Sequence, residues 1–134
     1  DDSRFATSGI NVGLFCSTPS VPVSRNLGRK QAMELLLTGH FIDAHTALQW
    51  GLVNRVVPAS RLDQEVAELA GSIMSKSWVA VATGKRMFYK QLELPLESAY
   101  DYASGVMAGN MMADDVEEGV DAFMQKRTPV WKHQ

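Results

Sequence analysis

The spacing of apolar residues predicts six helices along most of the chain. Between residues 28 and 39, apolar side chains recur every three or four positions, as on one face of a helix. The next predicted helix lies within residues 42–53, where Asp43 suits the N-cap and Gly51 suits a left-handed residue just beyond the last turn. The same spacing places four more helices near residues 60–73, 77–92, 96–112 and 114–124, and Ser77 is the predicted cap of the second of these.

The segments outside these helices show few signs of β-strand. Residues 52–58 are rich in β-branched side chains and end at Pro58, which predicts one short strand. Ser60, with Asp63 three positions on, resembles a capping box, whereas residues 5–20 combine small residues and turn formers and are expected to form a loop. The predicted fold class is therefore predominantly α with a few short strands.

Composition narrows the function classes. The chain has 134 residues, 46% of them hydrophobic, and a formal net charge of -2. No broad basic stripe is available for nucleic acid, and no apolar run reaches the roughly 20 residues of a membrane span. The single cysteine, Cys16, excludes an intrachain disulfide and favours a reducing intracellular compartment. A start at Asp1 without a methionine or leader suggests a truncated or processed chain.

Few residues suggest chemistry by themselves. His40, His45 and His133 do not have the spacing of a metal site, and glycine-rich phosphate loops are missing. Cys16 has no histidine or basic neighbour in sequence, so a loop residue is favoured over a nucleophile. The acidic cluster Asp114, Asp115, Glu117 and Glu118 fits a helix N-terminus better than an acid/base pair.

Several ordered segments resemble one known family. They are "FATSGINVGLFCSTPS", "GRKQAMELLLTGHFIDAHTALQWGLVNRVVP", "KRMFYKQL" and "ADDVEEGVDAFMQKRTPVW". Together they resemble the C-terminal half of the crotonase (enoyl-CoA hydratase/isomerase) superfamily, and within it a subgroup with a similar opening segment. The resemblance implies that residues 1–58 end the family's ββα spiral and that residues 59–134 form its helical trimerisation region.

The same resemblance bears on catalysis. It places the family's oxyanion hole and first catalytic glutamate upstream of Asp1, so this polypeptide alone is expected to be inactive. It also places Gly9 where hydratases of the family carry their second acid/base glutamate. Glycine cannot transfer a proton, so no catalytic residue is assigned. Returning a glutamate at position 9 is expected to raise hydratase activity if the rest of the site is intact.

Coenzyme binding is implied at the other end of the chain. The family's last helix contributes an aromatic residue and a lysine to coenzyme A, and these positions match Phe123 and Lys126, with Met107 where another aromatic is common. Phe123 also fits a core position, and Lys126 also suits helix-dipole compensation. Cys16 and Ser17 are candidates in the opening loop, where a hydroxyl holds a water or only caps the backbone.

Three functions stay open on these grounds. The first is a lyase of fatty-acid metabolism, nominally an enoyl-CoA hydratase or isomerase acting on an acyl-CoA thioester. The second is a non-catalytic acyl-CoA-binding or regulatory protein, and the third is an assembly role alone. All three imply a homotrimer or a dimer of trimers, no cofactor apart from the coenzyme A of the substrate, and no metal. The expected location is the mitochondrial matrix in a eukaryote or the cytoplasm in a bacterium.

Overall fold

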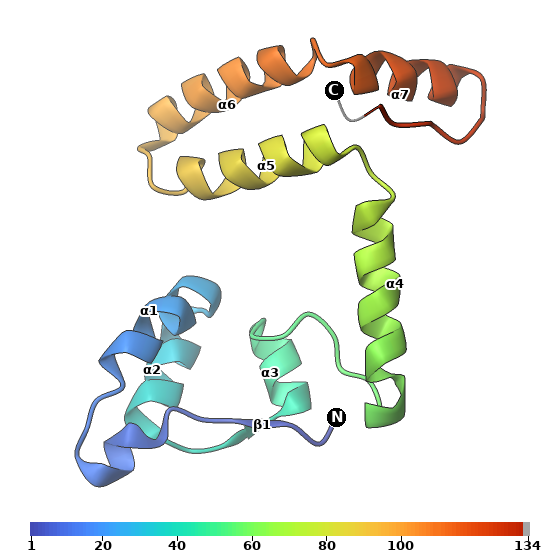
Figure 1. Cartoon of the computed structure of the whole chain (residues 1–134). Helices are drawn as coiled ribbons and strands as arrows, with labels where there is room; N and C mark the ends of the chain where they lie inside the picture. The colour runs from blue at the N-terminus through green and yellow to red at the C-terminus, as the bar shows by residue number, and fades with distance from the viewer. Residues whose placement is uncertain (133–134) are drawn as a thin grey trace. The chain divides into compact units, whose positions relative to one another are not determined.

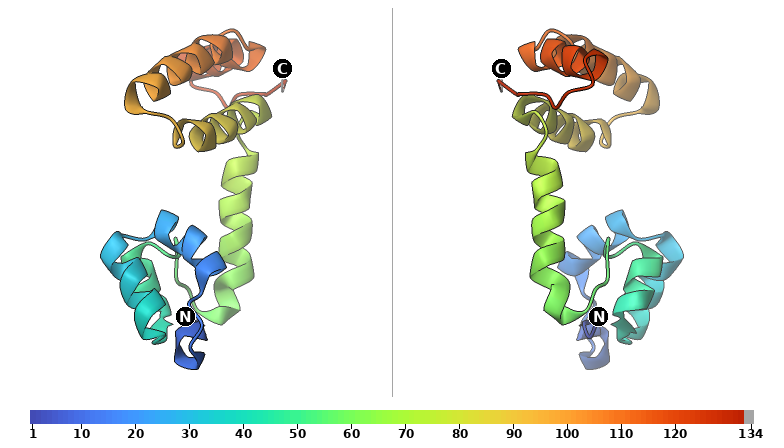
Figure 2. Two further views of the ribbon diagram at one scale, coloured as in Figure 1. Left: turned by 90° about the vertical axis from the view of Figure 1, so that its left-hand side faces the viewer. Right: turned by 90° about the vertical axis from the view of Figure 1, so that its right-hand side faces the viewer.

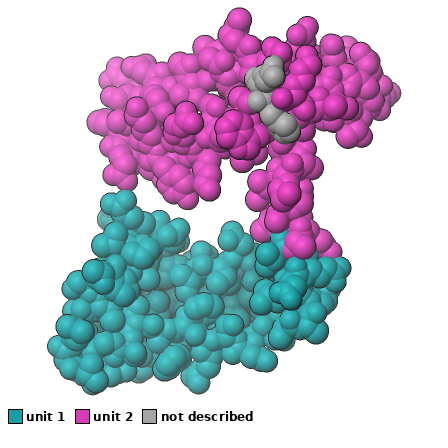
Figure 3. Space-filling model, in the orientation of Figure 1, with its two compact units in different colours: residues 1–66 teal, residues 67–134 magenta. Residues whose placement is uncertain are grey.

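The computed structural model describes residues 1–132 and divides the chain into two compact units, Asp1–Val66 and Ala67–Gln134 (Figure 3). Helices dominate both units, and the only strands among the described residues are two residues long (Figure 1). The predicted fold class, predominantly α with a few short strands, is confirmed. The predicted boundary between residues 58 and 59 concerns the domains of the family and stays a prediction.

The first unit is built around helix α2. Its elements are β1 (Arg4–Phe5), η1 (Ser8–Val12), α1 (Ser17–Asn26), α2 (Arg29–Thr38), β2 (Ile42–Asp43), α3 (Ala44–Trp50), η2 (Ala59–Arg61) and the start of α4 (Leu62–Met74). Helices α1 and α2 lie side by side (Figures 1 and 2). The small core consists of the apolar face of α2 and Leu27, which lies two positions before the helix; Leu27, Ala32 and Leu35 are all buried.

Two helix starts follow the predicted capping chemistry. The Thr46 backbone N–H donates to Asp43 Oδ1 at 2.7 Å, and this bond holds the pKa of Asp43 below its usual value. Helix α3 ends at Gly51, which has the predicted left-handed conformation with φ 84°. In the second unit the Ala80 N–H donates to Ser77 Oγ at 3.2 Å and caps helix α5. These three sequence predictions are confirmed.

The predicted strand at residues 52–58 is wrong. No part of this segment is assigned as strand, and the sheet instead pairs β1 with β2, Arg4 opposite Asp43 and Phe5 opposite Ile42. β-branched side chains favour a strand only where a neighbouring strand supplies its hydrogen bonds. The capping box is wrong as well, because Ser60 lies inside the 3₁₀ turn η2 and α4 begins after it, at Leu62.

The opening segment contains a helix that the sequence does not predict. Helix α1 covers Ser17–Asn26 although it contains Pro19 and Pro22. Pro19 lies in the first turn, where a backbone N–H has no partner within the helix, so its ring is tolerated. Pro22 removes one interior hydrogen bond. Packing against α2 therefore overrides a low local propensity.

The second unit contains helices α5 (Trp78–Gln91), α6 (Leu96–Asn110) and α7 (Asp114–Met124), joined by short turns. Helices α5 and α6 lie side by side, and the segment after α7 turns back along that helix (Figure 1). Over residues 1–132, no helix combines the length and the apolar character that crossing a bilayer requires.

Much apolar surface stays exposed. The chain exposes 10160 Å², whereas two separate compact bodies of half its mass would together expose about 8,400 Å². Side chains that contribute to this surface include Tyr100, Met111, Met112, Met124 and Val130.

Candidate functional site

The opening loop is folded onto the C-terminal end of α2. The Thr7 hydroxyl, which is buried, donates to the Leu35 carbonyl at 2.7 Å. Further along, Ile10 packs against Gly39, the left-handed residue that ends α2 with φ 62°, and a Cβ at Gly39 would lie 2.7 Å from the Ile10 side chain. The segment is therefore a fixed part of the first unit.

Gly9 lies in the tightest part of this loop. A Cβ placed on Gly9 would lie 2.7 Å from the Leu14 carbonyl oxygen and 2.8 Å from Cys16 Sγ. The Leu14 N–H donates to the Gly9 carbonyl at 3.0 Å, so the loop closes on itself around this glycine. Position 9 has no room for a side chain unless the backbone at Leu14 moves. The expected gain in hydratase activity when a glutamate is returned here stays a prediction, and it now requires that movement of the backbone.

Cys16 and Ser17 lie where the loop enters α1. Cys16 is half-buried at the N-cap position, with its sulfur beside Gly9. The Ser17 hydroxyl donates to the Phe15 carbonyl at 3.3 Å, and the Ser17 carbonyl accepts from the Ser20 hydroxyl at 2.6 Å. Of the two roles open to Ser17, the geometry favours local backbone bonding.

Helix α7 ends in a Schellman motif that presents Lys126. The Arg127 N–H donates to the Ala122 carbonyl at 3.0 Å, and the Lys126 N–H donates to the Phe123 carbonyl at 3.2 Å. Lys126 has φ 54°, the one positive value at a non-glycine among residues 1–132. Glycine is the usual residue at this position because a Cβ makes the left-handed conformation costly. The Lys126 side chain is exposed.

A charged pair holds the returning segment after this turn. The Arg127 guanidinium donates to both Glu118 carboxylate oxygens, at 2.5 and 2.8 Å, and the Val130 N–H donates to Glu118 Oε1 at 2.7 Å. The hydrogen bonds from Arg127, and then that from Val130, lower the pKa of Glu118 to about 2. Glu118 also raises the pKa of Arg127. The pair stays fully charged at neutral pH.

A second set of contacts holds the end of the segment. Asp115 is 4% exposed; it accepts from the Ser77 hydroxyl at 2.5 Å and from the Lys132 N–H at 2.7 Å. The Trp131 indole N–H donates to the Ser75 carbonyl at 2.8 Å, and its ring lies over Gly119, where an added Cβ would be 3.4 Å away. We call residues 125–132 the return segment and these contacts, together with those of Glu118, the return clamp.

The return clamp is the feature that sequence reasoning missed. Asp114, Asp115 and Glu117 do lie in the first turn of α7, as expected for helix-dipole compensation. Asp115 and Glu118, however, also hold a segment that lies up to 17 positions further along the chain. The only sequence signal was the acidic start and basic end of one segment, which indicates attraction between the ends without giving the partners.

The other coenzyme candidates lie in two separate hollows of the second unit. Phe123 is 81% exposed and lines a largely apolar cavity of about 650 Å³ together with Val79, Val116 and Trp131. Met107 is 64% exposed and lines a smaller groove of about 220 Å³ with residues of α5 and α6. Phe123 is therefore a surface residue in this unit, which removes the alternative of a core position within it.

Asn110 borders both hollows and has an open hydrogen-bonding position. Its Oδ1 atom is buried, and no described residue donates a hydrogen bond to it. A buried acceptor without a donor costs about 1–3 kcal/mol. A molecule that occupies the cavity and offers a donor at this point would remove that cost.

Metal chemistry finds no support in the described residues. Across residues 1–132, histidine, cysteine, aspartate and glutamate side chains nowhere gather in groups of three or more that could hold an ion. His40 and His45 are exposed, and His133 lies outside the described residues. The candidate features are thus a closed opening loop in the first unit and, described separately, a clamped lysine with an exposed aromatic in the second unit.

Comparison with known proteins shows the family of this chain. The enoyl-CoA hydratase/isomerase family model matches residues 1–134. The chain is 50% identical over 133 residues to the mitochondrial enoyl-CoA hydratase domain-containing protein 3 of Rattus norvegicus, covering 99% of this chain and 44% of that protein. The subgroup resemblance is thereby confirmed.

Solved structures give the same result. An enoyl-CoA hydratase of Mycobacterium smegmatis matches with a TM-score of 0.93 and 55% identity, over 97% of this chain and 51% of that one. The human enoyl-CoA hydratase domain-containing protein 3 matches with a TM-score of 0.91 and 49% identity, over 96% and 51%. The chain spans about half the length of the relatives that it matches. From its sequence and its fold, this chain belongs to the enoyl-CoA hydratase/isomerase family.

Proposed function

We propose that this chain supplies the coenzyme-binding end of a protein that binds an acyl-CoA thioester. The observation that carries the proposal is Lys126, a cation held in a left-handed turn at the end of α7 and exposed three positions after an exposed Phe123. The lysine ammonium is a compact positive charge suited to a phosphate of coenzyme A. The phenylalanine ring offers a face on which an adenine can stack.

Two candidates for the reaction have support. Hydration or isomerisation of an enoyl-CoA is favoured by the family to which the chain belongs. Binding without catalysis is favoured by the closed space at Gly9, where the family resemblance places the second glutamate. In the catalytic case, the proton to the α-carbon must come from a residue other than position 9.

Assembly and location complete the proposal. The exposed apolar side chains Tyr100, Met111 and Met112 suit subunit contacts in a homotrimer or a dimer of trimers. Trp131 is less suited to that role, because its indole is already bonded to the Ser75 carbonyl. The rat relative is named as mitochondrial, which supports the mitochondrial matrix if the source is eukaryotic. The proposal involves no nucleic acid, membrane, metal or separate cofactor.

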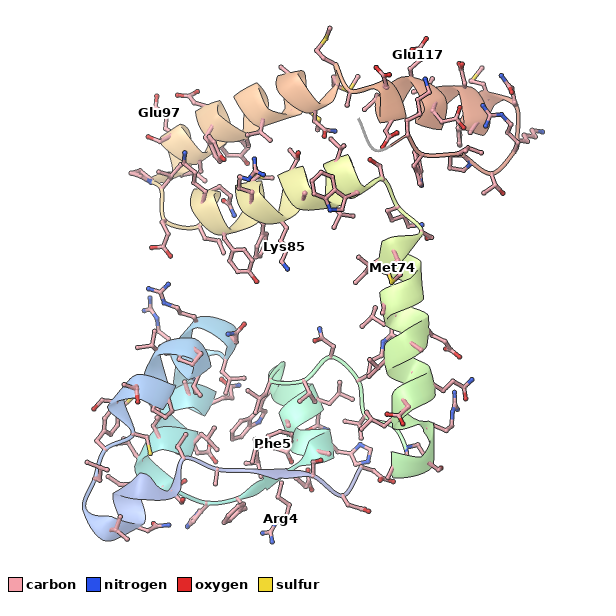
Figure 4. All side chains as sticks on the ribbon, viewed as in Figure 1. Arg4, Phe5, Met74, Lys85, Glu97 and Glu117 are labelled. Atoms are coloured by element: carbon pink, nitrogen blue, oxygen red, sulfur yellow. The ribbon has the colours of Figure 1, made fainter. Side chains whose placement is uncertain are left out.

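The coenzyme half is tested by titrating the full-length protein with acetyl-CoA in a calorimeter. Lys126→Ala is expected to weaken binding about 10-fold to 150-fold, because one charge-assisted contact to a phosphate contributes about 1.5–3 kcal/mol. Lys85→Ala is the matched control, an exposed lysine on α5 (Figure 4). Equal affinities of Lys126→Ala and wild type would remove Lys126 from the site.

The catalytic half needs a separate assay. Crotonyl-CoA hydration is monitored through the loss of the enoyl thioester absorbance at saturating crotonyl-CoA. A turnover at ordinary enzyme rates, of about 1–1000 per second, would establish the hydratase function and exclude binding alone. No turnover above the uncatalysed rate, with acetyl-CoA binding intact, would establish the non-catalytic alternative.

A further inference from the structure

The backbone at Lys126 is unfavourable for the residue that occupies it. A left-handed conformation is readily adopted by glycine and disfavoured for a residue with a Cβ. Such conformations persist where the surrounding structure fixes them, and they gather at functional positions. Here the Schellman hydrogen bonds fix the turn from the helix side. The return clamp fixes it from the other side.

Glu118 is the central residue of that second restraint. It lies two turns before Lys126 on α7 and binds the chain on the far side of Lys126 at two points, the Arg127 guanidinium and the Val130 N–H. Asp115 and Trp131 anchor the following residues to Ser77 and Ser75. None of these bonds involves the Lys126 ammonium. They determine where its backbone lies and leave the charge available.

We propose that Glu118 is a positioning residue that holds Lys126 in its left-handed turn and so aims the ammonium at a phosphate of the coenzyme. The inference rests on the proposed coenzyme function and adds to it a residue that never touches the ligand. Without Glu118, the Arg127 and Val130 bonds are lost, and residue 126 relaxes toward the more favourable right-handed or extended regions. The fraction of molecules with a correctly placed ammonium then falls, and apparent affinity falls by the same factor.

The test is a double-variant cycle on the full-length protein with acetyl-CoA as the probe. Glu118→Ala is expected to weaken binding about fivefold to tenfold. Glu117→Ala, which removes a like charge on the side of α7 away from the return segment (Figure 4), is expected to stay within about twofold of wild type. Because Glu118 acts through Lys126, adding Glu118→Ala to Lys126→Ala is expected to weaken binding no further.

The cycle separates positioning from general damage to the fold. A loss of affinity from Glu118→Ala that persists in full in the Lys126→Ala background would overturn the inference, because it would show an effect that bypasses Lys126. Should Glu118→Ala not fold, Arg127→Gln breaks the same pair from the return segment and carries the same expectations. The positioning role is refuted if folded Glu118→Ala or Arg127→Gln binds with wild-type affinity while Lys126→Ala binds weakly. That result leaves the proposed coenzyme function standing. Wild-type affinity of Lys126→Ala refutes both.

Discussion

Substitution of Gly9 by alanine tests the closed loop most directly. The added methyl would lie 2.7 Å from the Leu14 carbonyl oxygen and 2.8 Å from Cys16 Sγ, where ordinary contact begins near 3.4 Å. The sulfur can move by rotation of one side chain. The carbonyl belongs to the backbone, and it moves only if the Leu14 N–H to Gly9 carbonyl bond, 3.0 Å long, is strained or broken.

The expected cost follows from these two contacts. Overpacking by one methyl costs about 1–3 kcal/mol, and loss of a loop hydrogen bond adds about 0.5–1.5 kcal/mol. We therefore expect Gly9→Ala to destabilise the loop by about 1.5–4.5 kcal/mol. Gly9→Glu is expected to cost at least as much, because its first carbon meets the same obstacles. Relief by Cys16→Ala is partial, since the Leu14 carbonyl stays in place.

Amide hydrogen exchange followed by NMR is the appropriate assay, because the loop can open without unfolding the protein. A local cost of about 2 kcal/mol corresponds to about 30-fold faster exchange of the Leu14 N–H. Ser8→Ala is the matched control, because Ser8 is exposed and its change removes an atom instead of adding one. It is expected to leave the exchange rate within about threefold of wild type.

Two results would refute this reasoning. One is unchanged protection of Leu14 in Gly9→Ala, which would mean that the loop has space at position 9. The other is a Gly9→Glu variant with wild-type protection and raised hydratase activity. That result would restore the simpler interpretation, in which the chain has only lost a proton carrier.

Further predictions concern the second unit. Lys126→Gly is expected to stabilise the protein by about 1 kcal/mol in urea unfolding and to weaken acetyl-CoA binding as much as Lys126→Ala does. If the free energy of unfolding falls together with the affinity, strain at this turn is refuted. Ser77→Ala leaves the buried Asp115 without its hydroxyl donor and is expected to cost about 1–3 kcal/mol in the same assay, with exposed Ser72→Ala as control. The pKa of Glu118 is lowered to about 2 from a usual 4.5. The contribution of its carboxylate to the stability of the folded protein is therefore complete above pH 4.5 and is lost as pH falls toward 2. The Trp131 indole N–H resonance should report that loss below pH 4.5 and stay constant between pH 5 and 8.

Local sequence rules predicted much of the helical fold. Asp43, Gly51 and Ser77 cap helices in the structure because a cap depends on residues within four positions of it. The same range explains the failures. Whether residues 52–58 form a strand depends on a partner strand, and helix α1 depends on contact with α2, so neither could be read from its own residues.

The return clamp shows this limit most clearly in the candidate site. Asp115 and Ser77 are 38 positions apart, and Trp131 and Ser75 are 56 apart. Each of these residues has a sufficient local explanation, as a helix-start acid, a cap, a linker or a terminal aromatic. Only the fold brings them together. The resemblance to a family indicated Phe123 and Lys126 as candidates but gave no reason for their geometry.

Gly9 is a glycine without a positive φ, whereas Lys126 is a non-glycine residue with one. This contrast separates the roles of the two positions. Gly9 does not have the positive φ that calls for glycine, yet surrounding atoms exclude a Cβ. Packing thus explains this glycine without reference to a ligand. At position 126 the backbone favours glycine, yet a lysine occupies it with its side chain exposed. Packing gives no reason for that residue, so a ligand is the better explanation. The loop therefore bears on how the fold is built, and the proposal of coenzyme binding rests on the lysine.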